Sequence, residues 1–212
     1  MKVYTRKGDD GTTGLFYGGR VRKDSPAPTA YGGVDEAQAH IGLARALAAG
    51  HGVLDEILVS LGRDLWVLMA ELATAPENHA KLSDGSTRVT APMVERLEGL
   101  IDHTSALFDL PTEFVVPGES VVAAQLDVAR TATRRAERDS LGVEGVGTQV
   151  LAYLNRLSDL LWTLARWVEG ESLTARSVPE GDAAFTEDPA ANEPAPHEPA
   201  SEGESGVPTD GC

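Results

Sequence analysis

A glycine-rich segment near the start of the chain has the composition of an anion-binding loop. It reads YTRKGDDGTTGLF over residues 4–16, with pairs of acidic and hydroxyl side chains between its glycines. Backbone N–H groups in such turns can form a concave anion site, and threonine hydroxyls can add donors to phosphate oxygens. Residues 1–23 hold six cations and two acids, in a protein whose formal net charge is −15. The cations are Lys2, Arg6, Lys7, Arg20, Arg22 and Lys23.

This segment matches neither of the common phosphate-binding fingerprints. No Gly-x-x-x-x-Gly-Lys-Ser/Thr run occurs, and the glycine spacing does not fit a dinucleotide-binding βαβ unit. A polar segment rich in glycine is more often a simple turn, so the segment alone leaves both interpretations open.

Three arginines repeat at four-residue spacing in a second segment, QLDVARTATRRAERDS. A step of four residues advances a helix by about 40° beyond a full turn, so Arg130, Arg134 and Arg138 would lie on one drifting stripe. Guanidinium groups form strong charged hydrogen bonds with phosphate, so this stripe could hold a polyphosphate. The alternative is a solvent-exposed basic face with ion pairs inside the helix, in which Asp127 reaches Arg130 or Arg134.

The other polar residues show no nucleophilic unit and no metal site. No Ser/His/Asp or Cys/His arrangement is evident, and the five histidines lack the spacing of metal ligands. They are His40, His51, His79, His103 and His197. The single cysteine, Cys212, favours a reducing compartment. Without a signal-peptide pattern or a long apolar run, we expect a cytoplasmic protein that binds neither membranes nor nucleic acids.

Helical periodicity dominates the segments that must position these residues. The first helix is expected to have Asp35 in its first turn and to stop at Gly50. Four more helices are expected at about residues 54–72, 90–107, 120–140 and 148–169. Alanines 129, 132 and 136 give the fourth of the five helices a slim face for close packing. We therefore predict an all-α fold, a five-helix bundle after a short N-terminal irregular or β-like segment.

The C-terminal part of the sequence differs sharply from this body. From Glu180 onward there are nine acidic residues, five prolines and no Lys or Arg. Ordering such a segment costs about 1–2 kcal/mol per residue, with little apolar burial to offset it. We predict a helical domain over residues 1–176 and a disordered acidic tail over 177–212, which is solubilising or, alternatively, binds a partner.

Five segments, taken together and in order, resemble the PduO-type ATP:cob(I)alamin adenosyltransferases. They are TRKGDDGTTGLF, the Lys-Asp pair with YGGVDE and the following Ile-Gly, FVVPGES, RTATRRAER and YLNRLSDLLW. The resemblance implies a five-helix bundle that assembles as a homotrimer with active sites between subunits. It implies transfer of the 5′-deoxyadenosyl group of Mg-ATP to the cobalt of reduced cobalamin, with release of triphosphate. A reductase that supplies cobalt(I) and an enzyme that accepts adenosylcobalamin are implied as partners.

The resemblance also assigns residues to this site. The phosphate loop would be formed by Thr5, Arg6, Lys7, Gly8, Thr13 and Gly14, with a further contact from Lys23. The rest of the ATP site would be formed by Arg134, Arg135, Glu137, Arg138 and Asn155. Asp35 resembles an acid that pairs with the arginine matched here by Arg130. Phe114 resembles a phenylalanine that packs under the corrin and displaces its lower axial ligand, although an aromatic residue in a loop could instead plug the end of the bundle.

The sequence departs from the family pattern at four positions. Lys7 stands where a hydroxyl residue is common, Gly33 where threonine is usual, and Thr133 where cysteine is frequent. Glu119 follows Gly118 where a second glycine is more usual. Two other functions also fit the motifs: a non-catalytic nucleotide- or cobalamin-binding bundle that acts as a carrier or sensor, and a plain interaction bundle with an acidic tail.

Overall fold

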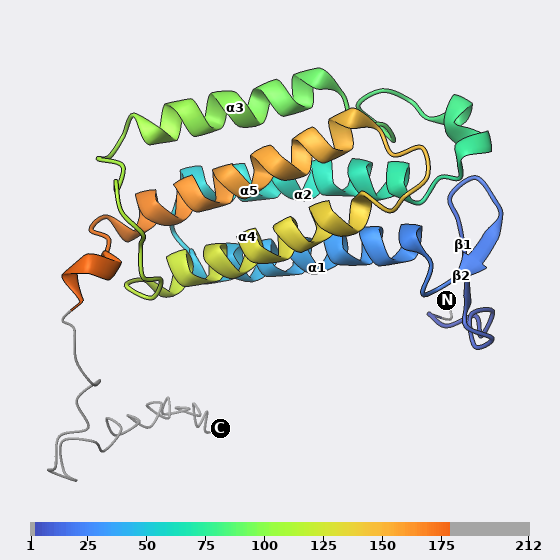
Figure 1. The fold of residues 1–212 in the computed structure, drawn as a ribbon, viewed down its shortest axis with the longest axis horizontal. Helices are drawn as coiled ribbons and strands as arrows, with labels where there is room; N and C mark the ends of the chain where they lie inside the picture. Colours follow the sequence, from blue (N-terminus) through green and yellow to red (C-terminus); the bar gives the residue numbers. More distant parts are fainter. Residues whose placement is uncertain (1–2, 179–212) are drawn as a thin grey trace, which may run out of the picture. The chain divides into compact units, whose positions relative to one another are not determined.

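The computed structural model describes residues 3–178, which form a β-hairpin followed by five α-helices (Figure 1). The strands are β1 (Thr12–Gly14) and β2 (Arg20–Arg22). The helices are α1 (Pro26–Leu47), α2 (Gly52–Leu72), α3 (Ala91–Ser105), α4 (Val121–Ser140) and α5 (Thr148–Glu169). Two 3₁₀ helices, η1 (Pro76–Lys81) and η2 (Ala175–Ser177), follow α2 and α5. The predicted helical bundle is confirmed, and residues 179–212 of the predicted tail lie outside the described residues.

The ends of α2 to α5 lie within about two residues of their predicted positions, but the start of α1 does not. α1 begins at Pro26, so the prediction that Asp35 lies in its first turn is wrong. Proline suits a first helical position because its missing N–H would be unpaired there anyway. Gly32 and Gly33 made a helix over residues 26–34 hard to predict, since glycine is a poor helix former.

A close contact between α1 and α4 sets the spacing of the bundle. α4 packs against α1 and α5, while α1 also packs against α2, and α5 against α3. A Cβ atom on Gly33 would lie 3.3 Å from both Cα and Cβ of Ala136, so glycine permits this approach. Ala129, Ala132 and Ala136 are all buried, which confirms the predicted slim face of α4. Leucines of α2 and α5 fill most of the remaining core.

The β-hairpin is attached to the end of α2. Its strands are antiparallel, and its turn places Tyr17 in the left-handed region at φ 63°. The Phe16 amide donates to the Ala73 carbonyl at 2.8 Å, just beyond α2. The connection between α3 and α4 lies at the opposite end of the bundle (Figure 1). Across residues 3–178, none of the helices combines the length and the hydropathy that crossing a membrane requires.

Candidate functional site

Hydrogen bonds among its own side chains shape the glycine-rich loop. The amide and Oγ1 of Thr12 donate to Asp10 Oδ1 at 2.9 and 2.7 Å. Arg20 Nε donates to Thr12 Oγ1 at 3.1 Å, and Arg20 Nη2 donates to the Lys7 carbonyl. The hydrogen bonds from Thr12 are the main cause of a lowered pKa of the Asp10 carboxyl. Arg20 therefore stabilises the conformation of the loop, since its Nε and Nη2 donate to groups within the loop.

Lys23 lies against the loop next to Gly8. A Cβ atom on Gly8 would come within 3.1 Å of Lys23 Nζ, so glycine allows the ammonium group to approach the loop backbone. The Lys23 amide donates to the Gly11 carbonyl at 2.9 Å. Thr5 Oγ1 accepts a longer hydrogen bond, 3.4 Å, from the Lys7 amide. The structure thus brings four of the predicted loop residues together.

Arg6 has a backbone conformation that is unusual for a residue with a side chain. Its φ is 59°, and its guanidinium lies 5.6 Å from the centre of the Tyr4 ring. Non-glycine residues in this region cost about 1–3 kcal/mol and occur often at ligand-binding sites. Thr13 and Gly14 follow in β1, where pairing with β2 fixes their backbone.

The predicted arginines of α4 differ in their surroundings. Arg134 and Arg138 are exposed, and Arg138 Nη1 donates to the Arg134 carbonyl at 3.0 Å. Arg135 instead forms an ion pair with Glu36 of α1. Next to them, Glu137 accepts a hydrogen bond of 3.4 Å from Asn155 Nδ2 of α5. Two site residues predicted from separate segments, Glu137 and Asn155, are therefore in contact.

The glycine-rich loop and the C-terminal part of α4 lie at the same end of the bundle. β2 leads into α1, and Pro26 at the start of α1 lies close to Gly142, which follows α4. Five cations of these segments take part in none of the ion pairs formed among residues 3–178. They are Arg6, Lys7, Lys23, Arg134 and Arg138. Cations without carboxylate partners, in an acidic protein, suit a polyanionic ligand.

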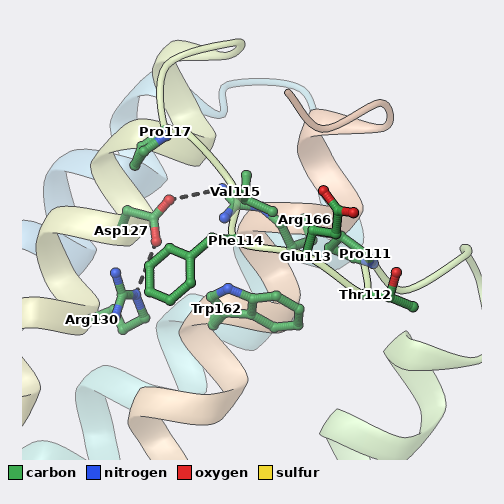
Figure 2. A pocket seen from close by; sticks show the side chains of 10 residues that line it. All are labelled: Pro111, Thr112, Glu113, Phe114, Val115, Pro117, Asp127, Arg130, Trp162 and Arg166. Carbon is green, nitrogen blue, oxygen red and sulfur yellow. Dashed lines mark hydrogen bonds and ion pairs between the residues drawn. The ribbon is translucent and has the colours of Figure 1, made fainter. Parts of the chain in front are cut away.

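A second region surrounds Phe114, beside a pocket of about 410 Å³ (Figure 2). Phe114 is 88% exposed, so the alternative that it plugs the bundle is wrong. The backbone around the ring is fixed, because Ala175 N donates to the Phe114 carbonyl and Val116 N donates to the Leu173 carbonyl, both at 2.8 Å. A fixed backbone thus presents a ring that is free to contact a ligand.

The floor of this pocket is an ion-pair network that the sequence did not fully reveal. Asp127 Oδ1 accepts from Arg130 Nε at 2.9 Å, and Asp127 Oδ2 accepts from Arg166 Nη2 at 2.8 Å. Asp127 and Arg166 are buried, and Trp162 lines the pocket beside them (Figure 2). For Arg130, the alternative of an ion pair with Asp127 inside the helix is therefore the one that the structure shows.

Some of the predicted site residues are not brought together within one chain. Asp35 is exposed on α1 and belongs to none of the ion pairs formed in the described part of the chain, while Arg130 pairs with Asp127. The glycine-rich loop and the Phe114 segment lie at opposite ends of the bundle (Figure 1). The predicted residues therefore form two groups.

Three residues of these groups were missed in the sequence. They are Glu36, Trp162 and Arg166. A signal for Arg166 was available, because an arginine within the apolar run LLWTLARW needs a buried partner. Glu36 offered no such signal, since its partner Arg135 lies far along the chain.

Comparisons with known proteins agree on one family. The family model for "Cobalamin adenosyltransferase" matches residues 3–168. A corrinoid adenosyltransferase of Mycobacterium tuberculosis strain H37Rv is 41% identical over 170 residues, covering 78% of this chain and 87% of the relative. A corrinoid adenosyltransferase of Citrobacter freundii is 39% identical over 168 residues, covering 78% and 93%. A variant of the PduO-type ATP:corrinoid adenosyltransferase from Lactobacillus reuteri, complexed with cobalamin and ATP, is 31% identical with a TM-score of 0.75, covering 83% of this chain and 97% of that one.

Proposed function

The chain belongs to the cobalamin adenosyltransferase family, and on this basis we propose that it transfers the 5′-deoxyadenosyl group of ATP to the cobalt of cob(I)alamin. The products are adenosylcobalamin and triphosphate. Within the structure, the observation that carries the proposal is the group of five cations outside every ion pair of residues 3–178. A triphosphate is the kind of ligand that such a group binds.

The reaction needs little acid–base chemistry from the protein. Cobalt(I) supplies the electron pair that forms the cobalt–carbon bond, while the C5′–O bond breaks and its electron pair leaves with the triphosphate. The protein must hold C5′ toward cobalt and stabilise the charge that grows on the leaving group. Arg134, Arg138 and the loop cations suit the second task. Asn155 suits the binding of a polar group of the nucleoside.

The Phe114 pocket suits the corrin. An exposed aromatic ring on a fixed backbone can pack under the macrocycle and occupy the place of its lower axial ligand. Loss of that ligand makes cobalt(II) easier to reduce to the nucleophilic cobalt(I). Arg130, held by Asp127 at the floor of the same pocket, suits a polar contact with the corrin periphery.

We further propose that the protein is a homotrimer with each site between two subunits. Attack of cobalt on C5′ requires ATP and corrin in contact, whereas the glycine-rich loop and the Phe114 segment lie at opposite ends of one bundle. Asp35 is exposed, and an Asp35 pair with Arg130 of the partner subunit would join the two groups. Light scattering should give a mass three times that of the chain, and a monomer that is fully active would contradict the arrangement.

Mg²⁺ is proposed to enter with ATP. Across the described residues, no group of three or more His, Cys, Asp or Glu side chains is arranged to hold a metal ion. Mg²⁺ usually binds through substrate phosphates, water and one or two carboxylates, and Glu137 between Arg134 and Arg138 fits that donor set. When bound, Mg²⁺ would neutralise part of the phosphate charge. A cytoplasmic location, a reductase that supplies cobalt(I) and an enzyme that accepts the product complete the proposal.

Absorbance of reduced cobalamin, followed with the full chain and ATP, tests this function. Growth of the alkylcobalt spectrum, with one triphosphate released per cobalt alkylated, is the expected result. Reactions without ATP or without protein are the controls. Binding of both ligands without any alkylcobalt product would identify a carrier or sensor instead, and no ATP binding would identify an interaction module.

A further inference from the structure

Four charged side chains form a continuous row beneath the Phe114 pocket. Arg130 and Arg166 each bind one carboxylate oxygen of Asp127, at 2.9 and 2.8 Å. On the other side of Arg166, its Nε lies 2.7 Å from Glu169 Oε2, in an ion pair that is not aligned as a hydrogen bond. The order of the row is Arg130, Asp127, Arg166, Glu169.

Arg166 and Glu169 are shielded from solvent, although Arg166 also lines the pocket. Arg166 is 1% exposed, and the side chain of Glu169 is fully buried. Desolvating charges costs free energy that their attraction often only just offsets, so a buried ion pair is weak evidence for stability. Its more general value is that it holds its members in one arrangement.

One end of the row fixes a side chain of the pocket. Arg166 binds Asp127 Oδ2 and holds the carboxylate in place, with Oδ1 directed at Arg130. The Arg130 guanidinium is bound through Nε, and its Nη groups are left for the pocket. Arg166 therefore determines the direction of Arg130 without touching it.

The other end of the row reaches the backbone that carries Phe114. Ser172 Oγ donates to Glu169 Oε2 at 3.0 Å. The residues that follow Ser172 pair with the Phe114 segment through the Leu173 carbonyl and the Ala175 amide. Glu169 thus ties the partner strand of the Phe114 segment to Arg166.

We propose that Arg166 is a positioning residue for the corrin half of the reaction, which orients Arg130 through Asp127 and the Phe114 segment through Glu169. The inference rests on the proposed function and adds a residue that acts through Asp127 and Glu169. Without Arg166, Arg130 and Phe114 would each keep their chemistry but lose their fixed relative placement. The consequence should fall on corrin binding and ligand displacement, because Arg166 and Glu169 form no ion pair with any of the five phosphate-binding cations among residues 3–178.

Arg166→Lys tests the proposal in the full-length protein. Lysine keeps the charge but cannot bind two carboxylates with a rigid fork. The rate of adenosylation that starts from cobalt(II) should fall about tenfold, which corresponds to the loss of one charged hydrogen bond. Cobalt(II) that has lost its lower axial ligand is four-coordinate, and the fraction of bound cobalt(II) with the four-coordinate spectrum should fall as well. Affinity for ATP should stay at the wild-type value, and most of the rate should return with pre-reduced cobalt(I).

Tyr153→Phe is the matched control on the same helix. Tyr153 is fully buried, and its hydroxyl donates to Asp64 Oδ2 at 3.0 Å, so this variant removes a buried polar contact outside the row. It should lower the melting temperature without changing the four-coordinate fraction. If Arg166→Lys does not fold, Glu169→Gln takes its place, with a smaller loss on the cobalt(II) route as the expected result.

The inference is overturned if Arg166→Lys loses ATP binding, turnover from cobalt(II) and turnover from cobalt(I) equally. It is overturned as well if the four-coordinate fraction of cobalt(II) bound to Arg166→Lys equals that of wild type. It is also overturned if Tyr153→Phe, at an equal loss of melting temperature, changes the spectrum as much. Failure of the wild-type protein to form alkylcobalt from cobalt(I) would instead overturn the proposed function.

Discussion

The charged residues of the Phe114 pocket and of the arginine stripe on α4 differ in whether they have ion-pair partners. In the pocket floor, Asp127 is bonded to Arg130 and Arg166, so a substitution there leaves a buried charge without its partner. Arg134 and Arg138 belong to no ion pair among residues 3–178, so their charge is left for a ligand. Substitutions at the first set should affect folding as well as activity, whereas those at the second should affect ligand binding alone.

Arg134→Ala should weaken ATP binding by about tenfold to a hundredfold, because one charged hydrogen bond contributes roughly 1.5–3 kcal/mol. Turnover should be nearly lost, since the triphosphate loses a fixed donor as its charge grows. Calorimetric titration with ATP and a rate measurement check this. Arg63→Ala, at an exposed arginine of α2, is the matched control and should bind ATP normally. Wild-type affinity and rate in Arg134→Ala would remove this arginine from the site.

Phe114→Ala should melt near the wild-type temperature and bind ATP normally, because the ring is exposed. Starting from cobalt(II) it should adenosylate slowly, since the lower axial ligand stays in place. The rate should recover substantially with pre-reduced cobalt(I). Val121→Ala, at another exposed apolar residue nearby in the chain, should change neither rate. An unstable Phe114→Ala protein, or one fully active from cobalt(II), would show that the assigned role is wrong.

The sequence predicted the exposed arginine stripe of α4 better than it predicted the ion-pair partners of other arginines. Four-residue spacing was enough to place Arg134 and Arg138 on one stripe, because helix geometry is local. The partners of Arg135 and Arg166 depend on how helices pack, and no local pattern contains that information. For the same reason the sequence left open whether Phe114 plugs the bundle, which its exposure decides.

At the scale of elements, the contact between α1 and α4 positions both groups of residues. Gly33 allows the approach to Ala136, whereas Gly42 on the same helix has open space around its Cα. The periodic apolar pattern was sufficient to predict α2 to α5. It failed for the start of α1, where two glycines and two prolines contribute to packing and capping rather than to an apolar stripe.

Gly33→Val should destabilise the protein by about 1–3 kcal/mol, the usual cost of overpacking a closed contact. Gly42→Val is the matched control and should be close to neutral, because valine fits an exposed helical position at least as well as glycine. Chemical denaturation of both variants gives the comparison. Equal stabilities would show that the seam between α1 and α4 relaxes freely around an added side chain.

Glu71 links the end of α2 to two other elements. Its Oε2 accepts from the Val89 amide at 2.6 Å, and its Oε1 lies so near Gly147, at the start of α5, that a Cβ atom there would be 2.6 Å away. Burial raises the pKa of this carboxyl, and the Val89 amide opposes the effect. The folded protein therefore binds a proton at Glu71 more tightly than the unfolded chain does.

Glu71→Gln should change the pH dependence of stability. Because the folded pKa is raised, the stability contributed by protonation is present below the unfolded pKa and is lost as pH rises through the folded pKa. The melting temperature of the variant, relative to wild type, should therefore rise across this window and then level off. Thermal melts between about pH 4 and pH 8 test it, since the ordinary glutamate pKa is near 4.3. A constant difference would mean that burial does not perturb this carboxyl.

At the scale of the whole molecule, one bundle carries the glycine-rich loop and the Phe114 segment at opposite ends. Local sequence patterns drew attention to both segments but did not predict their separation, because the direction in which helices pack is a tertiary property. The expectation that subunits join the two segments came from the family resemblance, which implies a trimer. The boundary of the tail, predicted at residue 177, stays a prediction.

A chain that ends at Val178 should keep the melting temperature and turnover of the full protein, because the residues beyond it are acidic, rich in proline and poor in apolar side chains. A chain that ends at Gly170 should lose turnover from cobalt(II), since the partners of the Phe114 segment, Leu173 and Ala175, are removed. Thermal melts and rates of both chains make the test. A fall of many degrees for the chain ending at Val178 would show that the tail stabilises the bundle.

The backbone pairing of the Phe114 segment also has a thermodynamic consequence. Fixing a backbone residue costs about 1–2 kcal/mol of conformational entropy, and here that cost is met when the protein folds rather than when it meets the corrin. Only the side-chain rotation of the ring is left to be restricted on binding. The heat capacity change of corrin binding should therefore reflect the apolar surface that is covered, without the additional contribution of a loop that folds around its ligand.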